Sequence, residues 1–362
     1  MNACPALLAG APGLCDWVLD GGRAERAPSA WRWRLRWHAR WSRVLQAQQR
    51  QRGGAARPQQ TPLFVLGLWR SGTTLLHERL SALPGLQSPL TWQCFNPASF
   101  LLTGAPTGPA RAVQRPMDDG EVRPDSAQED EFALLLQGAP SLYRGFIDPR
   151  RLGELATTMF APMAPGRPPI GDAWADDWLR FLAGVERQGG GHRVVLKSPN
   201  HTLRWPALAN LFPQAPRIWI GRPLEQVWHS NLRMWRAMFD TYALWTCPPG
   251  VLEAFLQRCI AQYLAALEQA LAETGPPPLW VDFEDLFAQP LPLLRALADF
   301  AAVDAEVCPE WVLADVVQRL PARPPRTAAA ALPPATLPLA QAVDRLHAQA
   351  RQRWHWQQRA AA

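Results

Sequence analysis

Short apolar runs alternate with segments of helical pattern through the middle of this chain. Four runs are short and apolar enough to be buried strands: LFVLGL (63–68), VVLK (194–197), RIWIG (217–221) and LWVDF (279–283). A helical pattern follows each run, in residues 73–83, 203–212, 224–238 and 291–301. The alternation predicts an α/β fold in which helices cover both faces of a parallel sheet. Because ligands of such sheets bind at the carboxyl ends of the strands, residues there are the first candidates for a functional site.

The segments around this alternation differ in composition. Residues 98–190 are rich in Pro, Gly and charged turns, and we interpret them as a helical insertion that shapes a substrate site. We therefore predict an N-terminal helical extension (1–60), one main domain (61–320) and a C-terminal tail (321–362). No run approaches the ~18 apolar residues that a membrane-spanning helix needs.

The N-terminal extension contains a basic aromatic stretch. Trp33, Trp37 and Trp41 are spaced i, i+4, i+8, so they would share one face of a helix. Such a helix either docks its Trp face on the core or lies on a membrane surface. We predict the docked arrangement and keep membrane contact as the lesser alternative.

Cysteine usage and charge limit the compartment and the partners. The 6 Cys are scattered, with no CxxC pair and no Cys/His cluster, which argues against a zinc site and a disulfide framework. The simplest compartment is a reducing cytoplasm, and the N-terminus lacks the basic region of a signal peptide. The 37 basic residues exceed the 31 acidic ones by a net charge of +6 without forming a long run. An anionic small molecule therefore fits, and nucleic acid is not indicated.

The first strand leads into a loop that is suited to binding an anion. Its sequence, GLWRSGTT (67–74), has two glycines five residues apart, as in the nucleotide P-loop. A strand, loop and helix in this order present backbone N–H groups and a helix N-terminus to an anion. Thr73, however, stands where a P-loop needs its Lys, which argues against ATP or GTP hydrolysis. Arg70, Ser71 and Thr74 supply donors that suit a phosphate or sulfate without a metal.

A second anion-binding pattern follows the third predicted strand. Arg222 comes directly after the strand, and Ser230 lies eight residues on. If the helix begins near Leu224, Ser230 lies about two turns into it. Two anion sites at the ends of two parallel strands fit a nucleotide that carries two separate phosphate groups.

In both motifs the chain resembles sulfotransferases that use 3′-phosphoadenosine 5′-phosphosulfate (PAPS). PLFVLGLWRSGTTLLHERL is similar to their 5′-phosphosulfate loop, and its RSGTT form resembles the bacterial, tyrosylprotein and Golgi branches. RIWIGRPLEQVWHSNLRM resembles their 3′-phosphate motif, and the resemblance covers about residues 62–303. It implies metal-free transfer of the sulfuryl group to a hydroxyl or amine, with release of 3′,5′-bisphosphoadenosine. By this resemblance, Arg222 and Ser230 hold the 3′-phosphate, and the 5′-phosphosulfate is held by Arg70, Ser71, Gly72, Thr73 and Thr74.

Lys197 is the only Lys among the 37 basic residues. It ends the second predicted strand, on the sheet edge where Arg70 and Arg222 are expected. A position that keeps Lys in an Arg-rich chain points to a need for a compact ammonium group. Sulfuryl transfer builds charge on the bridging oxygen, so we predict that Lys197 stabilises the transferring group.

The acceptor must also lose a proton, and the sequence offers three candidate bases. EDEFAL (129–134) resembles an acidic segment of the bacterial branch that opens a helix. Glu129 and Glu131 lie beside an apolar run, which favours a role as base, or else they complement a helix dipole. His201 is the rival, because imidazole titrates near neutrality, or else it is a helix-cap histidine.

One departure from the family pattern leaves alternatives open. Some relatives carry a catalytic Glu about twenty residues after the loop, whereas this region reads LTWQCFNP, with Gln93 after Trp92. If Gln93 occupies that position, it cannot accept a proton. A non-catalytic protein that binds PAPS or its product is therefore one alternative, and a P-loop nucleotide kinase is a weaker one. The insertion has no motif that identifies the acceptor.

Overall fold

The computed structural model describes residues 12–22, 24–25, 31–52, 57–107, 112–118, 120–160, 172–319 and 330–360. The chain forms two compact units. Unit 1 consists of residues 1–59, 89–188 and 232–258, and unit 2 of residues 60–88, 189–231 and 259–362. The domain boundaries proposed above, at residues 60 and 320, stay a prediction.

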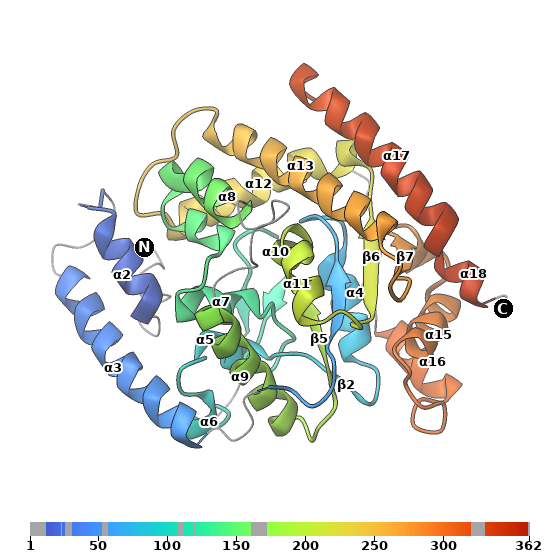
Figure 1. The fold of residues 1–362 in the computed structure, drawn as a ribbon, viewed down its shortest axis with the longest axis horizontal. Coiled ribbons are helices and arrows are strands. Elements are labelled where there is room, and N and C mark those ends of the chain that lie inside the picture. Colours follow the sequence, from blue (N-terminus) through green and yellow to red (C-terminus); the bar gives the residue numbers. More distant parts are fainter. Residues whose placement is uncertain are drawn as a thin grey trace. The chain divides into compact units, whose positions relative to one another are not determined.

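Unit 2 is built on a five-stranded parallel sheet in the order β2-β5-β1-β6-β7 (Figure 1). Its strands are β1 (Leu63–Leu66), β2 (Leu86–Gln87), β5 (Arg193–Lys197), β6 (Arg217–Gly221) and β7 (Leu279–Asp282). The α/β fold class and the four predicted strands are confirmed. The edge strand β2 was not predicted, because two residues are too few to show a pattern.

Helices cover both faces of this sheet. Leu63 and Val65 of β1 share a hydrophobic core with residues of four helices: α4 (Thr73–Ser81), α15 (Pro290–Phe300), α16 (Glu310–Gln318) and α18 (Trp356–Ala360). Phe64 points to the other face, where its ring packs against Trp205 of α11 (Trp205–Leu211). Because both faces are buried, β1 is apolar at every position.

The helix predicted over residues 203–212 is two helices, α10 (Pro199–Leu203) and α11. Pro206 lies in the first turn of α11, a place that tolerates Pro, whereas a continuous helix would have put it in the interior. The remaining helices of this part of the chain are α12 (Leu224–Tyr242), α13 (Val251–Ala272), α14 (Asp285–Ala288) and α17 (Leu337–Trp354), with a short 3₁₀ turn at Pro334–Thr336.

The C-terminal helices are attached to the end of β7 by a polar cluster. Asp282 accepts hydrogen bonds from Arg351 at 2.6 and 2.8 Å, and Asp285 accepts one from Trp356 Nε1 at 3.0 Å. Burial opposes ionisation of Asp282, but the hydrogen bonds from Arg351 and Trp280 hold its pKa below the ordinary value. His355 lies close enough to both carboxylates for the three to hold a metal ion. Their oxygens already accept from Arg and Trp donors, so we assign the cluster a structural role.

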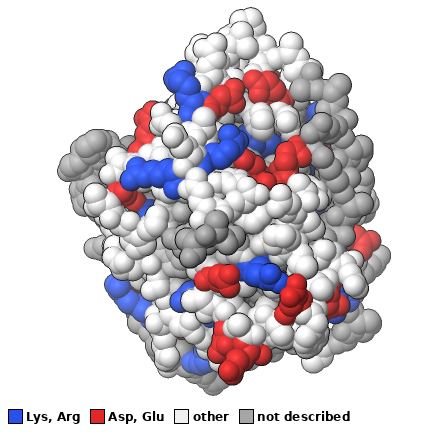
Figure 2. Space-filling model, turned by 90° about the vertical axis from the view of Figure 1, so that its right-hand side faces the viewer, with Lys and Arg blue, Asp and Glu red and all other residues white. Residues whose placement is uncertain are grey.

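A buried histidine lies beside this cluster. The His347 ring, on α17, is 5% exposed, and its Nε2 lies 2.8 Å from Tyr263 Oη. Burial lowers the pKa of His347 from 6.5 to about 4. On the side of the molecule that carries α15 to α18, basic and acidic side chains are interspersed (Figure 2).

Unit 1 is mostly helical. Its elements include α2 (Pro12–Asp20), α3 (Trp31–Arg52), α5 (Thr91–Phe95), α6 (Phe100–Thr103), α7 (Glu131–Gln137), α8 (Leu152–Phe160), α9 (Asp172–Gln188), 3₁₀ turns at Leu142–Phe146 and Pro149–Arg151, and the antiparallel pair β3 (Val113–Gln114) and β4 (Glu121–Val122). No helix in the described ranges is long and apolar enough to span a membrane.

The prediction for the N-terminal helix is wrong about the face that docks. The helix forms as α3, but Trp33, Trp37 and Trp41 are 61%, 59% and 55% exposed. The buried face consists of Trp31, Leu35, Ala39, Ser42 and Gln49. Both sets repeat at helical spacing, and the second set includes the small side chains that let α3 approach α2 closely. Helical spacing shows which residues share a face, but not which face is covered.

Candidate functional site

Three neighbouring strands of unit 2 bring the predicted site residues to one edge of the sheet. β1 lies between β5 and β6, with Val65 opposite Lys197 and Leu66 opposite Trp219. Lys197 ends β5, residues 67–72 follow β1, and Arg222 follows β6. A parallel sheet exposes its ligand-binding edge at these carboxyl ends.

The loop after β1 needs both of its glycines. A Cβ on Gly67 would lie 2.8 Å from the carbonyl oxygen of Ile220. Gly72 has a φ of +98°, and its Cβ would lie 2.6 Å from the Phe283 ring. Arg70, between them, also adopts a left-handed φ, of 68°, which costs on the order of 1–3 kcal/mol for a non-glycine residue. The backbone is therefore held in a conformation that the surrounding packing must enforce.

Two hydroxyl groups hold the loop in place. Ser71 Oγ donates to the carbonyl of Leu68 at 2.7 Å, which closes the turn. Thr202 Oγ1 accepts from the Gly67 N–H at 2.8 Å and lies 3.1 Å from the Gly67 carbonyl, to which it donates. Helix α4 then begins at Thr73, so the N–H groups of its first turn lack acceptors within the helix. Such groups suit an anion.

The structure joins the two predicted anion sites into one network. Arg70 Nε donates to Ser230 Oγ at 3.1 Å, and Arg222 Nη1 donates to the carbonyl of Arg70 at 3.1 Å. The Arg222 guanidinium also lies 4.0 Å from the centre of the Phe283 ring, a cation–π contact that fixes its plane. Ser230 and Arg222 are both half-buried, and Arg222 Nε also donates to Gln226 Oε1 at 3.0 Å.

Lys197 is connected to the same loop. Its side chain is 3% exposed, and Nζ donates to Thr74 Oγ1 at 3.2 Å. The ammonium group at the end of β5 and a hydroxyl in the first turn of α4 therefore lie next to each other, because β5 and β1 are neighbouring strands and α4 follows β1.

Two further residues of this network were missed by sequence reasoning. Thr202 anchors Gly67, and Asn231 Nδ2 donates to the carbonyl of Trp69 at 3.0 Å. The only signal for them in the sequence is position, since Asn231 adjoins Ser230 and Thr202 lies five residues after Lys197. Neither residue type points to loop anchoring by itself.

The candidate bases differ in their surroundings. His201, in unit 2, is completely buried, and its ring packs edge-on against Phe64 at 6.0 Å. Glu129 and Glu131 belong to unit 1. Glu131 begins α7 and is completely buried, whereas Glu129 is half-buried and accepts a 2.6 Å hydrogen bond from Tyr143 Oη.

Gln93, also in unit 1, has a local structural role. Its Oε1 accepts from the N–H of Leu90 at 2.7 Å, which caps the start of α5. Its Nε2 donates to Gln188 at 2.7 Å. Both ends of the amide are therefore engaged, in an arrangement that a carboxylate could not reproduce at Nε2.

Comparisons with known proteins identify the family of the chain. A sequence model of the sulfotransferase family matches residues 62–306. The omega-hydroxy-beta-dihydromenaquinone-9 sulfotransferase Stf3 of Mycobacterium bovis is 30% identical over 241 residues, which are 65% of this chain and 61% of the relative. The protein of the same name from Mycobacterium tuberculosis matches equally. The match thus spans about three fifths of the length of these curated relatives.

Solved structures share the fold. Sulfotransferase STF9 from Mycobacterium avium superposes with a TM-score of 0.60 and 19% identity, over 87% of this chain and 82% of the other. Sulfotransferase STF1 from Mycobacterium tuberculosis H37Rv gives 0.56 and 18% over 88% of each chain. The branch suggested by the RSGTT form stays a prediction. The family match over more than half of the sequence confirms the wider resemblance: the chain belongs to the sulfotransferase family.

Proposed function

We propose that this protein transfers the sulfuryl group of PAPS to a hydroxyl group. The observation that carries the proposal is the hydrogen-bonded network of Arg70, Ser230 and Arg222. Beside it, Lys197 donates to Thr74 in the first turn of α4, directly after the loop. Together these residues offer two guanidinium groups and one ammonium group to a ligand with two separate anionic ends. The loop lacks the Lys that a nucleotide kinase uses on the β- and γ-phosphates, which speaks against that alternative.

The residues present fit the donor. The N–H groups at the start of α4, with the hydroxyls of Thr73 and Thr74, would hold the 5′-phosphosulfate. Ser71, whose hydroxyl donates to the carbonyl of Leu68, would shape the loop instead. Arg222 and Ser230 would hold the 3′-phosphate. Arg70 reaches Ser230, so its guanidinium would serve both phosphate groups rather than the 5′ end alone.

In the proposed reaction the acceptor oxygen attacks sulfur in line with the bond that breaks. The bond between sulfur and the bridging oxygen breaks, and that oxygen leaves on 3′,5′-bisphosphoadenosine with a growing negative charge. Lys197 Nζ would stabilise this charge in a buried site, where electrostatic stabilisation is stronger than in water. The step itself requires only positioned donors and a base.

We propose Glu129 as the base that takes the proton of the acceptor. A base must be reachable by the acceptor, and Glu129 is half-buried, whereas Glu131 and His201 are completely buried. Tyr143 Oη donates to Oε2 of Glu129 at 2.6 Å, which would orient the carboxylate.

The class of acceptor is proposed from the curated relatives. By name, Stf3 acts on a hydroxylated dihydromenaquinone. We propose that the acceptor here is likewise a hydroxyl group on a lipid-soluble molecule.

Transfer of ³⁵S from labelled PAPS tests the function. The acceptor panel contains an ω-hydroxylated prenylquinol and a long-chain alcohol, together with a tyrosine peptide, a sugar and an amine. Label on a lipid-soluble alcohol supports the full proposal, and label on another member corrects only the acceptor class. Binding of 3′,5′-bisphosphoadenosine without transfer to any acceptor would favour the non-catalytic alternative, and turnover of Mg·ATP would favour the kinase.

A further inference from the structure

Helix α3 exposes an apolar face that the proposed reaction does not use. Trp33, Trp37, Trp41 and Val44 are 61%, 59%, 55% and 46% exposed, and we call them the Trp face. They fall on one side of the helix, because the spacings of four, four and three residues each return to nearly the same direction. The rings of Trp37 and Trp41 stack, with centroids 6.5 Å apart and planes at 14°. Three exposed Trp on one helix form a patch, whereas single exposed apolar residues are ordinary.

The opposite side of α3 is firmly attached within unit 1. Gln49 donates to the carbonyl of Pro97 at 2.6 Å and accepts from the N–H of Leu101 at 2.9 Å. Arg50 forms an ion pair with Asp177, and Arg43 forms one with Asp16 of α2. The helix therefore cannot roll its Trp face inward without breaking these contacts.

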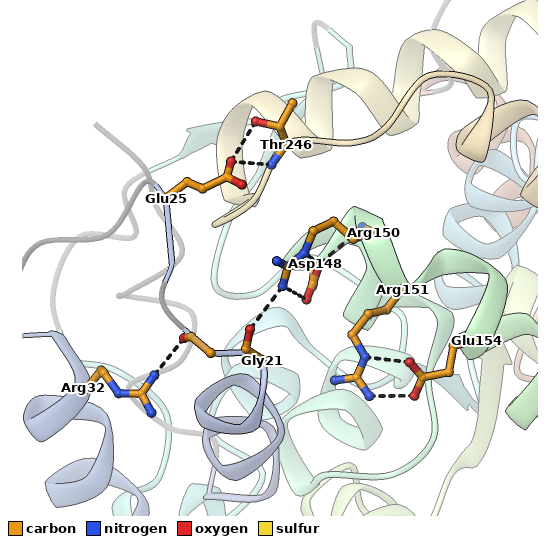
Figure 3. Close-up of polar contacts among 9 residues, drawn as sticks. Gly21, Glu25, Arg32, Asp148, Arg150, Arg151, Glu154 and Thr246 are labelled. Carbon is orange, nitrogen blue, oxygen red and sulfur yellow. Dashed lines mark hydrogen bonds and ion pairs between the residues drawn. The ribbon is translucent and has the colours of Figure 1, made fainter.

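The segments around α2 and α3 are held as well (Figure 3). Arg32 donates to the carbonyl of Gly22 at 2.8 Å, and Arg150 links Asp148 to the carbonyl of Gly21 at 3.2 Å. Glu25 accepts from both the N–H and the hydroxyl of Thr246. The Trp face is thus presented by a fixed element.

The charge on α3 is of one sign. Its sequence, WRWRLRWHARWSRVLQAQQRQR, contains seven Arg and no Asp or Glu. Arg34, Arg36 and Arg40 are exposed and have no ion pair with any residue that the structure describes. At 100° per residue, Arg36 and Arg40 flank one edge of the Trp face and Arg34 flanks the other. An apolar stripe bordered by unpaired cations is complementary to a surface that is apolar inside and anionic outside.

We propose that α3 lies on an anionic lipid bilayer, with the Trp face at the boundary between headgroups and acyl chains and the flanking Arg side chains at the headgroups. Trp prefers the membrane–water interface, because its ring is apolar and its N–H needs a polar partner. Arg extends its charged end toward the headgroups while its stem stays on the apolar side. A second copy of the chain is a poorer occupant, since two α3 helices would bring like charges together. This inference is independent of the reaction and of the acceptor.

Vesicle flotation of the full chain tests the proposal. The vesicles are phosphatidylcholine alone, or phosphatidylcholine with a third of phosphatidylglycerol. We expect binding to the anionic vesicles at least tenfold stronger than to the neutral ones, and weakened in 0.5 M salt, because each Arg near an anionic surface strengthens binding about fivefold. Equal binding to both vesicles, or no binding to the anionic ones, would overturn the proposal.

Two variants with matched controls assign the binding to α3. Trp33→Gln/Trp37→Gln/Trp41→Gln should lose at least tenfold in vesicle affinity, whereas Trp311→Gln, which removes a 72% exposed Trp on α16, should lose less than twofold. The second variant removes the charges of Arg34, Arg36 and Arg40, and its control removes three exposed charges elsewhere, at Arg236, Arg295 and Arg319. The variant without the charges of Arg34, Arg36 and Arg40 should bind the anionic vesicles more weakly, whereas its control should bind them like the wild type.

Each remaining outcome has a defined meaning. Thermal unfolding at the wild-type temperature verifies that a variant is folded, and the Arg variant decides the test if the Trp variant is not. Wild-type binding by both α3 variants would overturn the proposal. The proposal would also be overturned if the wild-type protein were a dimer that does not bind vesicles and the Trp variant were a monomer. The Trp face would then contact a second copy of the chain.

Discussion

Replacing Lys197 tests the proposed role of the chain's one lysine. Lys197→Met keeps the length of the side chain and removes Nζ, which donates to Thr74 at 3.2 Å in a site only 3% exposed. If Nζ acted only in the ground state, the loss would be one charge-assisted hydrogen bond, about 1.5–3 kcal/mol. It would then appear as weaker binding of the donor, with kcat unchanged.

The proposed mechanism predicts the opposite distribution. A donor that stabilises charge developing in the transition state contributes about 10²–10³-fold to kcat, or about 2.7–4 kcal/mol. We expect this fall in kcat for Lys197→Met, with the affinity for 3′,5′-bisphosphoadenosine changed by less than about tenfold. Lys197→Arg should also lose turnover, because a planar fork cannot replace a compact ammonium in a buried site.

The assay is steady-state transfer of ³⁵S to the acceptor that the panel identifies. Calorimetry with 3′,5′-bisphosphoadenosine and thermal unfolding serve as controls for binding and folding. Thr74→Ser, which keeps the hydroxyl that Nζ contacts, should stay within about threefold of wild type. A kcat for Lys197→Met within threefold of wild type, in a folded protein, would refute the role assigned to the ammonium.

The other predictions concern donor binding, the base and stability. Arg222→Gln should weaken calorimetric binding of 3′,5′-bisphosphoadenosine by about 1.5–3 kcal/mol and leave adenosine 5′-monophosphate nearly unchanged, since only the former has a 3′-phosphate; equal losses would contradict the assignment. Glu129→Gln should lower kcat by about 10²–10⁴-fold without changing bisphosphate affinity, while Tyr143→Phe retains most of the turnover; an active Glu129→Gln would return the role of base to the buried candidates. The folded-state pKa of His347, about 4, lies below its ordinary 6.5, so the stability that depends on the neutral ring is complete above pH 6.5 and is lost as the pH falls toward 4. Urea unfolding should therefore show about 2 kcal/mol less stability at pH 5 than at pH 7 from this group, and His347→Phe should remove that difference.

The sequence predicted β1, β5, β6 and β7 because their apolar runs are continuous and bounded by clear turns, and it missed the two-residue β2. It also predicted which side chains follow each strand. It could not predict that Arg70 contacts Ser230, which lies 160 residues further along the chain. That contact depends on β6 lying next to β1, and strand order in a parallel sheet is set by crossovers rather than by any local pattern.

Two other features were beyond the pattern for physical reasons. Thr202 anchors the loop through the N–H and the carbonyl of Gly67. Many small polar residues could make such contacts, so the residue type alone does not predict which one does. In α3, Trp33 and Leu35 belong to two different apolar stripes, and helical spacing does not show which one is covered. The stripe that carries Trp33, Trp37 and Trp41 is the exposed one, and the proposed membrane contact rests on it.

Direct binding of the donor product tests the central claim most directly. Calorimetry of the full chain would compare 3′,5′-bisphosphoadenosine, adenosine 5′-monophosphate and Mg·ATP. Two anion sites connected through Arg70 and Arg222 predict that the bisphosphate binds without metal, at least tenfold more tightly than the monophosphate. Equal affinity for the two adenosine phosphates, or tightest binding of Mg·ATP, would contradict the account.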